Sequence, residues 1–274
     1  MLIDTHCHLD YLEVPQIAGG ISGALERSRQ VGVRAIVLPA VGPENFDRVR
    51  ALAHAHSEVF YALGIHPIYV DNMGDAALRD LENALDRNRH DPKLLAVGEI
   101  GLDHYVPNLD REKMELTYAA QLRMAADFDL PVILHVRKAQ DQVLKFLRRF
   151  NIRKGIAHAF NGSSTQAHAF IKQGLMLGFG GAMTFTRALQ IRRLAADLPL
   201  DHLVLETDSP DIAPAWKIKG DLNEPAETAR IAQHLAALRN ESMEAIIRET
   251  GRNAARALPR LDRFFNHTNS LSVS

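Results

Sequence analysis

The sequence predicts an α/β fold, a TIM (β/α)8 barrel, from the number, composition and spacing of its apolar runs. Eight short runs rich in Val, Ile and Leu alternate with segments of helical periodicity along the chain. The runs are apolar throughout, as is typical of parallel strands that are buried on both faces. Eight such units in 274 residues match the size of a closed barrel. The alternative, an open doubly wound sheet, lacks the expected G-x-G-x-x-G turn after its first strand.

The expected strands follow one another at intervals that leave room for a helix between each pair. They occupy residues 2–6, 33–40, 59–66, 94–100, 131–136, 154–160, 174–181 and 202–208. Two intervening segments have a clear helical stripe. In 76–88 the stripe contains Leu78, Leu81 and Leu85, and 111–128 shows the same spacing. Both stripes predict helices that pack one apolar face against the sheet.

The composition is that of a globular protein with a substantial core. Hydrophobic residues make up 46% of the chain, and the net charge of -1 argues against a strongly basic nucleic-acid-binding domain. A single cysteine excludes an intramolecular disulfide framework. With no visible signal peptide and no apolar stretch of about 18 residues, we expect a cytoplasmic protein without membrane contact or an obligate protein partner. We expect one domain over residues 1–265 and a disordered polar tail over 266–274.

Imidazole and carboxylate side chains gather at the carboxyl ends of the expected strands. His6 and His8 are two residues apart, so both rings lie on one face of an extended chain. Similar groups end five further runs: His66, Glu99, His135, His158 and Asp208. In a barrel these ends meet at one rim, where barrel enzymes have their active sites. Seven such groups from six strands therefore indicate a metal site.

The side-chain types also indicate which metals and which chemistry to expect. Imidazole and carboxylate ligands suit zinc, manganese, cobalt or nickel, and a carboxylate-rich site also accepts magnesium. The ligands exceed the needs of one tetrahedral ion, and a carboxylate can bridge two ions. We therefore expect two divalent metal cations per subunit and a hydrolytic reaction. Glycosidase chemistry would leave the histidines without a role, and the G-x-S-x-G motif of a serine hydrolase is absent.

Seven segments resemble, in order, the signatures of the TatD family of metal-dependent hydrolases and deoxyribonucleases, which belong to the amidohydrolase-like barrels. They read IDTHCHLD (3–10), GIHP (64–67), VGEIGLD (97–103), LPVILHVRKA (130–139), HAFNG (158–162), ETDSP (206–210) and NEP (223–225). The similarity is greatest to the YjjV-like branch. It implies that His6, His8 and Asp208 hold one ion, that His135 and His158 hold the other, and that Glu99 bridges them.

Individual roles follow from chemistry and position. Besides binding metal, Asp208 is predicted to orient the attacking water as general base, and Glu99 is the second predicted catalytic residue. The predicted substrate-binding residues are His66, Arg137 and Asp103. A guanidinium suits a phosphate, and Arg137 lies on the strand face of the fifth-strand histidine. Each has a structural alternative: a loop role for His66, a pairing with a rim carboxylate for Arg137, and a loop cap for Asp103.

The resemblance favours a two-metal phosphodiesterase, a deoxyribonuclease that attacks nucleic-acid ends through a metal-activated water. Arg187, Lys217, Lys219, Tyr105 and Trp216 fall in loops on the expected rim, where they could contact DNA or another phosphodiester. One alternative is hydrolysis of a small ester, amide or lactone, or of aminoacyl-tRNA esters as proposed for relatives. The other is a non-catalytic protein stabilised by metal, which the cysteine-free ligand set disfavours.

Overall fold

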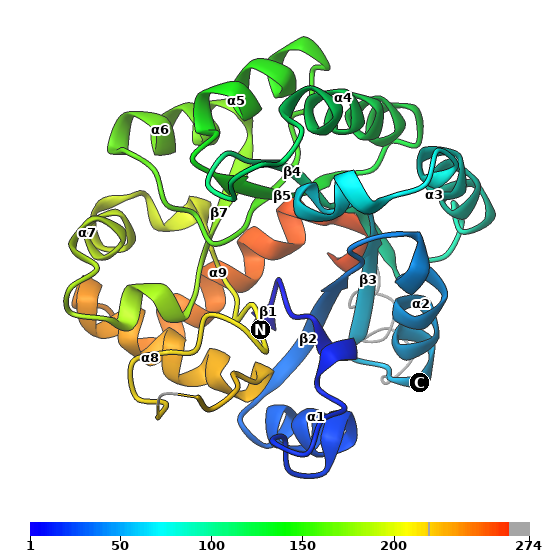
Figure 1. Cartoon of the computed structure of the whole chain (residues 1–274). Coiled ribbons are helices and arrows are strands. Elements are labelled where there is room, and N and C mark those ends of the chain that lie inside the picture. The colour runs from blue at the N-terminus through cyan, green and yellow to red at the C-terminus, as the bar shows by residue number, and fades with distance from the viewer. Residues whose placement is uncertain (219, 263–274) are drawn as a thin grey trace, which may run out of the picture.

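The computed structural model describes residues 1–218 and 220–262, and its centre is a barrel of eight parallel strands (Figure 1). The strands are β1 (Leu2–Asp4), β2 (Val33–Pro39), β3 (Val59–Leu63), β4 (Leu94–Asp103), β5 (Val132–Arg137), β6 (Gly155–Ala157), β7 (Leu175–Phe179) and β8 (Leu203–Leu205). Each strand pairs in parallel with the next one along the chain. The predicted TIM barrel is confirmed. Lys219 and the expected tail, 266–274, lie outside the described residues.

The first and last strands join through main-chain hydrogen bonds that run past their ends. The bonds are Thr5 N–H to Leu205 O (3.0 Å), Asp208 N–H to His6 O (2.8 Å) and His8 N–H to Ser209 O (2.7 Å). The buried Asp4 carboxylate reinforces this junction, because it accepts hydrogen bonds from the backbone and hydroxyl of Thr207 at 2.9 and 2.6 Å. Residues about 200 positions apart in the chain are thereby fixed side by side.

Helices α1 to α8 of the described chain form a ring outside the strands (Figure 1). They are α1 (Gly20–Gln30), α2 (Phe46–Ala55), α3 (Ala77–Arg87), α4 (Arg111–Asp127), α5 (Gln140–Arg149), α6 (Ser164–Gln173), α7 (Leu189–Asp197) and α8 (Thr228–Arg239). Short 3-10 turns occupy Leu9–Tyr11, Pro43–Asn45, Pro67–Asn72, Gly181–Thr184, Leu200–His202 and Pro225–Glu227. The outward-facing residues of the strands pack under the ring in one continuous apolar layer. No helix among residues 1–218 and 220–262 is long and apolar enough to cross a bilayer.

A ninth helix, α9 (Met243–Ala257), crosses the amino-terminal opening of the barrel (Figure 1). Its residues Ala254 and Ala257, with Leu258 and Leu261 just beyond, join the apolar cluster inside the barrel. That cluster holds the inward residues of the strands, such as Phe60 and others from all eight strands. The amino-terminal end is therefore closed by apolar packing, and polar groups enter the barrel interior from the carboxyl end.

Most strands end earlier than the apolar runs suggest. The run at 154–160 contains only Gly155–Ala157 as strand, and the run at 202–208 contains only Leu203–Leu205. The remaining residues of these runs belong to loops at the rim, and these loops contain His158 and Asp208. β4 and β5 are exceptions, because they continue to Asp103 and Arg137, beyond the predicted ends at residues 100 and 136. The predicted strands are too long because loop residues at the rim are buried, as strand residues are.

Candidate metal centre

The six predicted metal ligands come together at the carboxyl end of the barrel. Glu99 and His135 lie in β4 and β5, and the other four lie just beyond the ends of β1, β6 and β8. Strand alternation explains the inward direction on β5 and β6. Ile133 and Ile156 belong to the apolar cluster inside the barrel. His135 lies two residues after Ile133, and His158 lies two residues after Ile156. Their roles as metal ligands stay predictions, but the structure brings all six residues together.

One set of ligand atoms lies at the junction of β1 and β8. The Nε2 atoms of His6 and His8 are 3.3 Å apart. Glu99 Oε2 lies 3.2 Å from the first and 3.5 Å from the second, and Asp208 Oδ1 lies 3.4 and 3.8 Å from them. Four ligands about 2.1 Å from an ion would stand about 3.4 Å apart at the corners of a tetrahedron. The five separations above lie near this value, and His6, His8 and Asp208 form one group of possible metal ligands.

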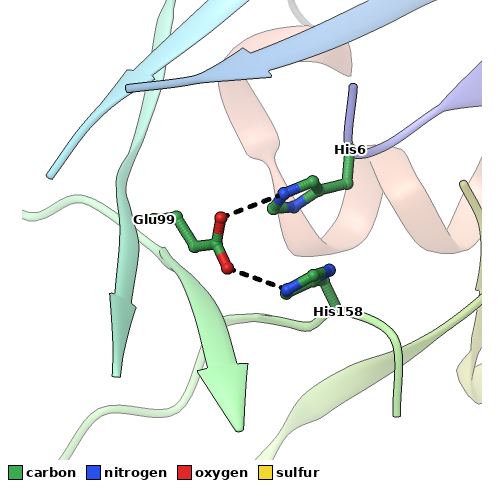
Figure 2. A group of neighbouring side chains, drawn as sticks. All are labelled: His6, Glu99 and His158. Atoms are coloured by element: carbon green, nitrogen blue, oxygen red, sulfur yellow. Dashed lines mark ion pairs between the residues drawn. The ribbon is translucent and has the colours of Figure 1, made fainter. Parts of the chain in front are cut away.

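A second set surrounds the other oxygen of the same carboxylate. Glu99 Oε1 lies 2.8 Å from His158 Nε2 and 3.0 Å from His135 Nδ1. In Figure 2 the two oxygens of Glu99 point in different directions, one toward His6 and the other toward His158. The imidazoles of His6 and His158 stack with ring centroids 3.9 Å apart. This arrangement makes Glu99 the common member of two neighbouring sets of donor atoms.

The protonation behaviour of these groups also fits a cation site. Glu99 is buried, yet the surrounding imidazoles hold the pKa of its carboxyl well below the ordinary value. Burial disfavours a charge on His158, but the Glu99 carboxylate beside it raises the pKa of that imidazole to about 10. When no metal is bound, the proton on the His158 imidazole supplies the positive charge next to Glu99. A divalent cation would supply that charge and would displace the proton.

His66 faces the second set but differs from the other histidines in its hydrogen bonds. Its Nε2 lies 3.2 Å from Glu99 Oε1 and 3.1 Å from His135 Nδ1, so distance alone would allow a ligand role. Its Nδ1 accepts a hydrogen bond from the Ile68 N–H, and burial lowers its pKa. A neutral imidazole that accepts at Nδ1 carries its proton on Nε2. His66 therefore presents an N–H donor to the centre, which suits contact with an anion.

Asp103 is predicted to bind substrate, but in the structure its carboxylate contacts other residues of the chain. Oδ2 lies 3.0 Å from His135 Nε2, and Oδ1 accepts the backbone N–H groups of Tyr105 and Val106 at 2.7 and 2.9 Å. The residue is 2% exposed, and these partners hold its pKa at about 2 against the effect of burial. Asp103 thus faces His135 and a loop. A carboxylate in this position keeps the His135 proton on Nε2 and leaves Nδ1 free for a metal.

Glu206 lies inside the same centre but was missed as a candidate residue. Its Oε1 accepts the N–H of Ala159 at 2.5 Å, next to His158, whose Nδ1 is 3.9 Å away. Burial raises the pKa of Glu206 to about 8. Gly178 makes this position possible, because a Cβ there would collide with Oε2 of the carboxylate. The segment ETDSP contains Glu206 two residues before Asp208, which was the available signal.

A cavity of about 830 Å³ leads from solvent to these groups. His8, Glu99, His135, His158 and Asp208 line its floor. Three exposed tyrosines also line it, Tyr11, Tyr69 and Tyr105, and so do Asn161, Ser163 and Gln190. Trp216 does not line it, since its indole N–H donates to Glu227 and its ring packs beneath Arg230. The cavity has room for a molecule much larger than water.

A parallel barrel whose carboxyl rim gathers imidazoles and carboxylates below an open cavity is the architecture of a metal-dependent hydrolase. The comparisons agree. A family model described as TatD related DNase matches residues 3–259. The chain is 40% identical over 245 residues to the metal-dependent hydrolase YjjV of Escherichia coli K12, covering 89% of this chain and 92% of that protein. A metal-dependent hydrolase of Haemophilus influenzae is 38% identical over 258 residues, with 92% and 97% covered.

The fold agrees with solved structures of the same group. The crystal structure of Escherichia coli YjjV, described as a TatD homolog, superposes with a TM-score of 0.88 at 38% identity and covers 94% of this chain and 98% of that one. A TatD family hydrolase of Entamoeba histolytica, at 18% identity, shares the fold with a TM-score of 0.81 over 94% and 97% of the two chains. The chain belongs to the TatD family and is a metal-dependent hydrolase.

Proposed function

We propose that the protein is a two-metal phosphodiesterase that acts on nucleic-acid ends. The observation that carries this proposal is the pair of donor sets that share Glu99 at the floor of an open cavity. When bound, two divalent cations supply a water nucleophile near neutral pH and polarise the bond to be broken. In this proposal His6, His8 and Asp208 would hold one cation, His135 and His158 would hold the other, and Glu99 would serve both.

The residues of the chain have distinct roles in this reaction. Asp208 directs Oδ1 at His6 and His8, and its side chain, 13% exposed, borders the cavity. Its other oxygen is available as the general base that takes the proton of the attacking water. The Nε2–H of His66 donates to a non-bridging oxygen of the phosphate. Arg137, at the cavity wall, supplies a permanent positive charge for the anionic substrate.

Glu99 fixes the positions of the two donor sets relative to each other during this reaction. It is 1% exposed, and each of its oxygens lies within 3.5 Å of at least two imidazole nitrogens. These contacts remove the rotational freedom of the carboxylate. The general base and the phosphate-binding groups therefore lie at fixed positions relative to one another. Such preorganisation supplies a large part of the rate advantage of an enzyme site.

The proposal is tested by an activity screen with the full chain, supplied in turn with zinc, manganese, magnesium, cobalt or nickel. The substrates are single-stranded DNA, RNA, bis-p-nitrophenyl phosphate, an aminoacyl-tRNA and p-nitrophenyl acetate, and Asp208→Asn provides the background. We expect metal-dependent cleavage of DNA and of the phosphodiester, abolished in the variant. Turnover confined to carboxylic esters would overturn the phosphodiesterase proposal and favour the small-molecule alternative.

A further inference from the structure

Arg137 and Lys138 are the only arginine and lysine that line the cavity among the described residues. Both side chains are exposed, and neither has a carboxylate within 4.0 Å or a side-chain hydrogen bond in that part of the chain. Two other cations near the rim are paired, Arg27 with Glu224 at 2.6 Å and Lys217 with Glu227 at 3.3 Å. The two cations at the cavity wall therefore keep their full charge for a group outside the chain.

Tyr105 holds these two cations together. The Arg137 guanidinium lies 3.8 Å from the centre of the Tyr105 ring, and the Lys138 ammonium lies 4.9 Å from it. Cation–π contact of this kind orients a charge without neutralising it. Because the ring is engaged in this way, Tyr105 serves as a platform for cations, where the sequence had indicated a surface for stacking of bases.

The platform is itself fixed to the metal centre. The Asp103 carboxylate closes the turn that presents Tyr105, and its other oxygen contacts His135. Asp103 and Arg137 are also paired across β4 and β5 in the sheet register. Lys138 follows directly, with a φ of 54° at the turn after β5. The two cations thus have a set position beside the second donor set.

We propose that Arg137, Lys138 and Tyr105 form a subsite for a second phosphate of the substrate, separate from the phosphate that is cleaved. An arginine and a lysine side by side offer a planar fork and a point charge, which together suit a dianionic phosphate. The inference rests on the proposed phosphodiesterase function and specifies its substrate. The preferred substrate carries a further phosphate next to the bond that is hydrolysed.

The kinetic test uses two substrates that differ by one phosphate. Both are p-nitrophenyl esters of thymidine 5'-phosphate, and one of them also has a 3'-phosphate. We expect the metal-loaded enzyme to prefer the second by about tenfold or more in kcat/KM, as for a hydrogen-bonded charge pair. Arg137→Ala and Lys138→Ala should each reduce this preference, the double variant should abolish it, and Tyr105→Leu should weaken it. Arg148→Ala and Lys145→Ala remove exposed cations of α5 that do not line the cavity, and they should preserve it.

A binding test separates the subsite from the reaction. Calorimetry with the full chain, with and without added metal, compares thymidine 3',5'-bisphosphate with thymidine 5'-monophosphate. Tighter binding of the bisphosphate that depends on Arg137 and Lys138 supports the subsite even if no phosphodiester is cleaved, in which case only the proposed function fails. If phosphodiesters are cleaved but neither kcat/KM nor binding responds to the extra phosphate, the subsite is refuted and the phosphodiesterase stands.

Discussion

At the amino-terminal end of the barrel, the Lys93 ammonium donates to main-chain carbonyls of Ala53, His56 and Val59, where α2 ends and β3 begins. At the carboxyl end, the Nε2 atoms of His6 and His8 face each other and two carboxylates. Both regions bury polar groups. In the first, each donor meets acceptors of the same chain. In the second, imidazole nitrogens and carboxylate oxygens converge on one another, an arrangement that a bound cation would complete.

The difference shows how a structural polar cluster can be told from a functional one. Burial and unusual pKa values occur at both ends, since burial lowers the pKa of Lys93 and the imidazoles depress the pKa of Glu99. The direction of the hydrogen-bonding atoms is what distinguishes them. We therefore expect substitutions at the amino-terminal end to change stability, and substitutions at the carboxyl end to change metal binding and turnover.

Replacement of Glu99 should have the largest effect. Glu99→Gln removes the charge shared by both donor sets, so both metals should bind weakly. Because bound metals stabilise the transition state by several kcal/mol, kcat should fall by about a thousandfold or more. Metal content by mass spectrometry and steady-state rates measure this. Glu112→Gln, an exposed neighbour on α4, is the matched control. Unchanged metal content and turnover in Glu99→Gln would refute the bridging role.

Asp103→Asn should have the next largest effect. The new amide would donate to His135 Nε2, so the imidazole proton would move to Nδ1, the atom that faces Glu99. Loss of such a carboxylate behind a ligand histidine lowers metal affinity by about 10- to 100-fold. Titration calorimetry should show one weakened ion and one unchanged ion, whereas the exposed Asp127→Asn should bind both normally. Equal weakening of both ions would argue that Asp103 acts on the whole rim.

A change of pH should alter metal affinity by less than the two substitutions above, but by a measurable amount. The pKa of His158 is about 10 without metal, above its ordinary value, so the ring is protonated at pH 7. A metal requires the neutral imidazole, and binding must therefore release a proton. Affinity should rise by about tenfold per pH unit for each proton released between pH 6 and 8. Calorimetry in buffers of different ionisation enthalpy counts these protons, and a heat independent of buffer would contradict the expectation.

Lys93→Met should affect turnover least. The substitution leaves carbonyls around the end of α2 without their ammonium donor, which costs about 1 to 3 kcal/mol in the free energy of unfolding. Urea denaturation of the metal-loaded protein measures this loss, with the exposed Lys145→Met as control. Activity at saturating substrate should remain that of the parent protein. A large drop in turnover of the folded variant would show that the two ends of the barrel are coupled.

The sequence was sufficient to predict the barrel and to predict that six imidazole and carboxylate residues lie together at its rim, because both depend on regular rules. Inward alternation on parallel strands and the common rim of their carboxyl ends bring His135 and His158 to one place. Hydrogen-bond direction is not encoded in spacing, so the sequence could not pair Asp103 with His135, or show that His66, predicted to bind substrate, presents an N–H group to the centre. Glu206 was missed because its position depends on the space that Gly178 leaves on a different strand. The closure of the barrel by α9 likewise depends on tertiary packing.

The hydrogen bonds that join β1 to β8 have a consequence for the order of events during synthesis. His6 and His8 leave the ribosome some 200 residues before Asp208 and the strand beside them. At about 5 to 20 residues per second, the early histidines wait roughly 10 to 40 s for their carboxylate partner. The first cation position can form only after the nascent chain has been translated past β8. A chain truncated before Asp208 therefore has no such site to load.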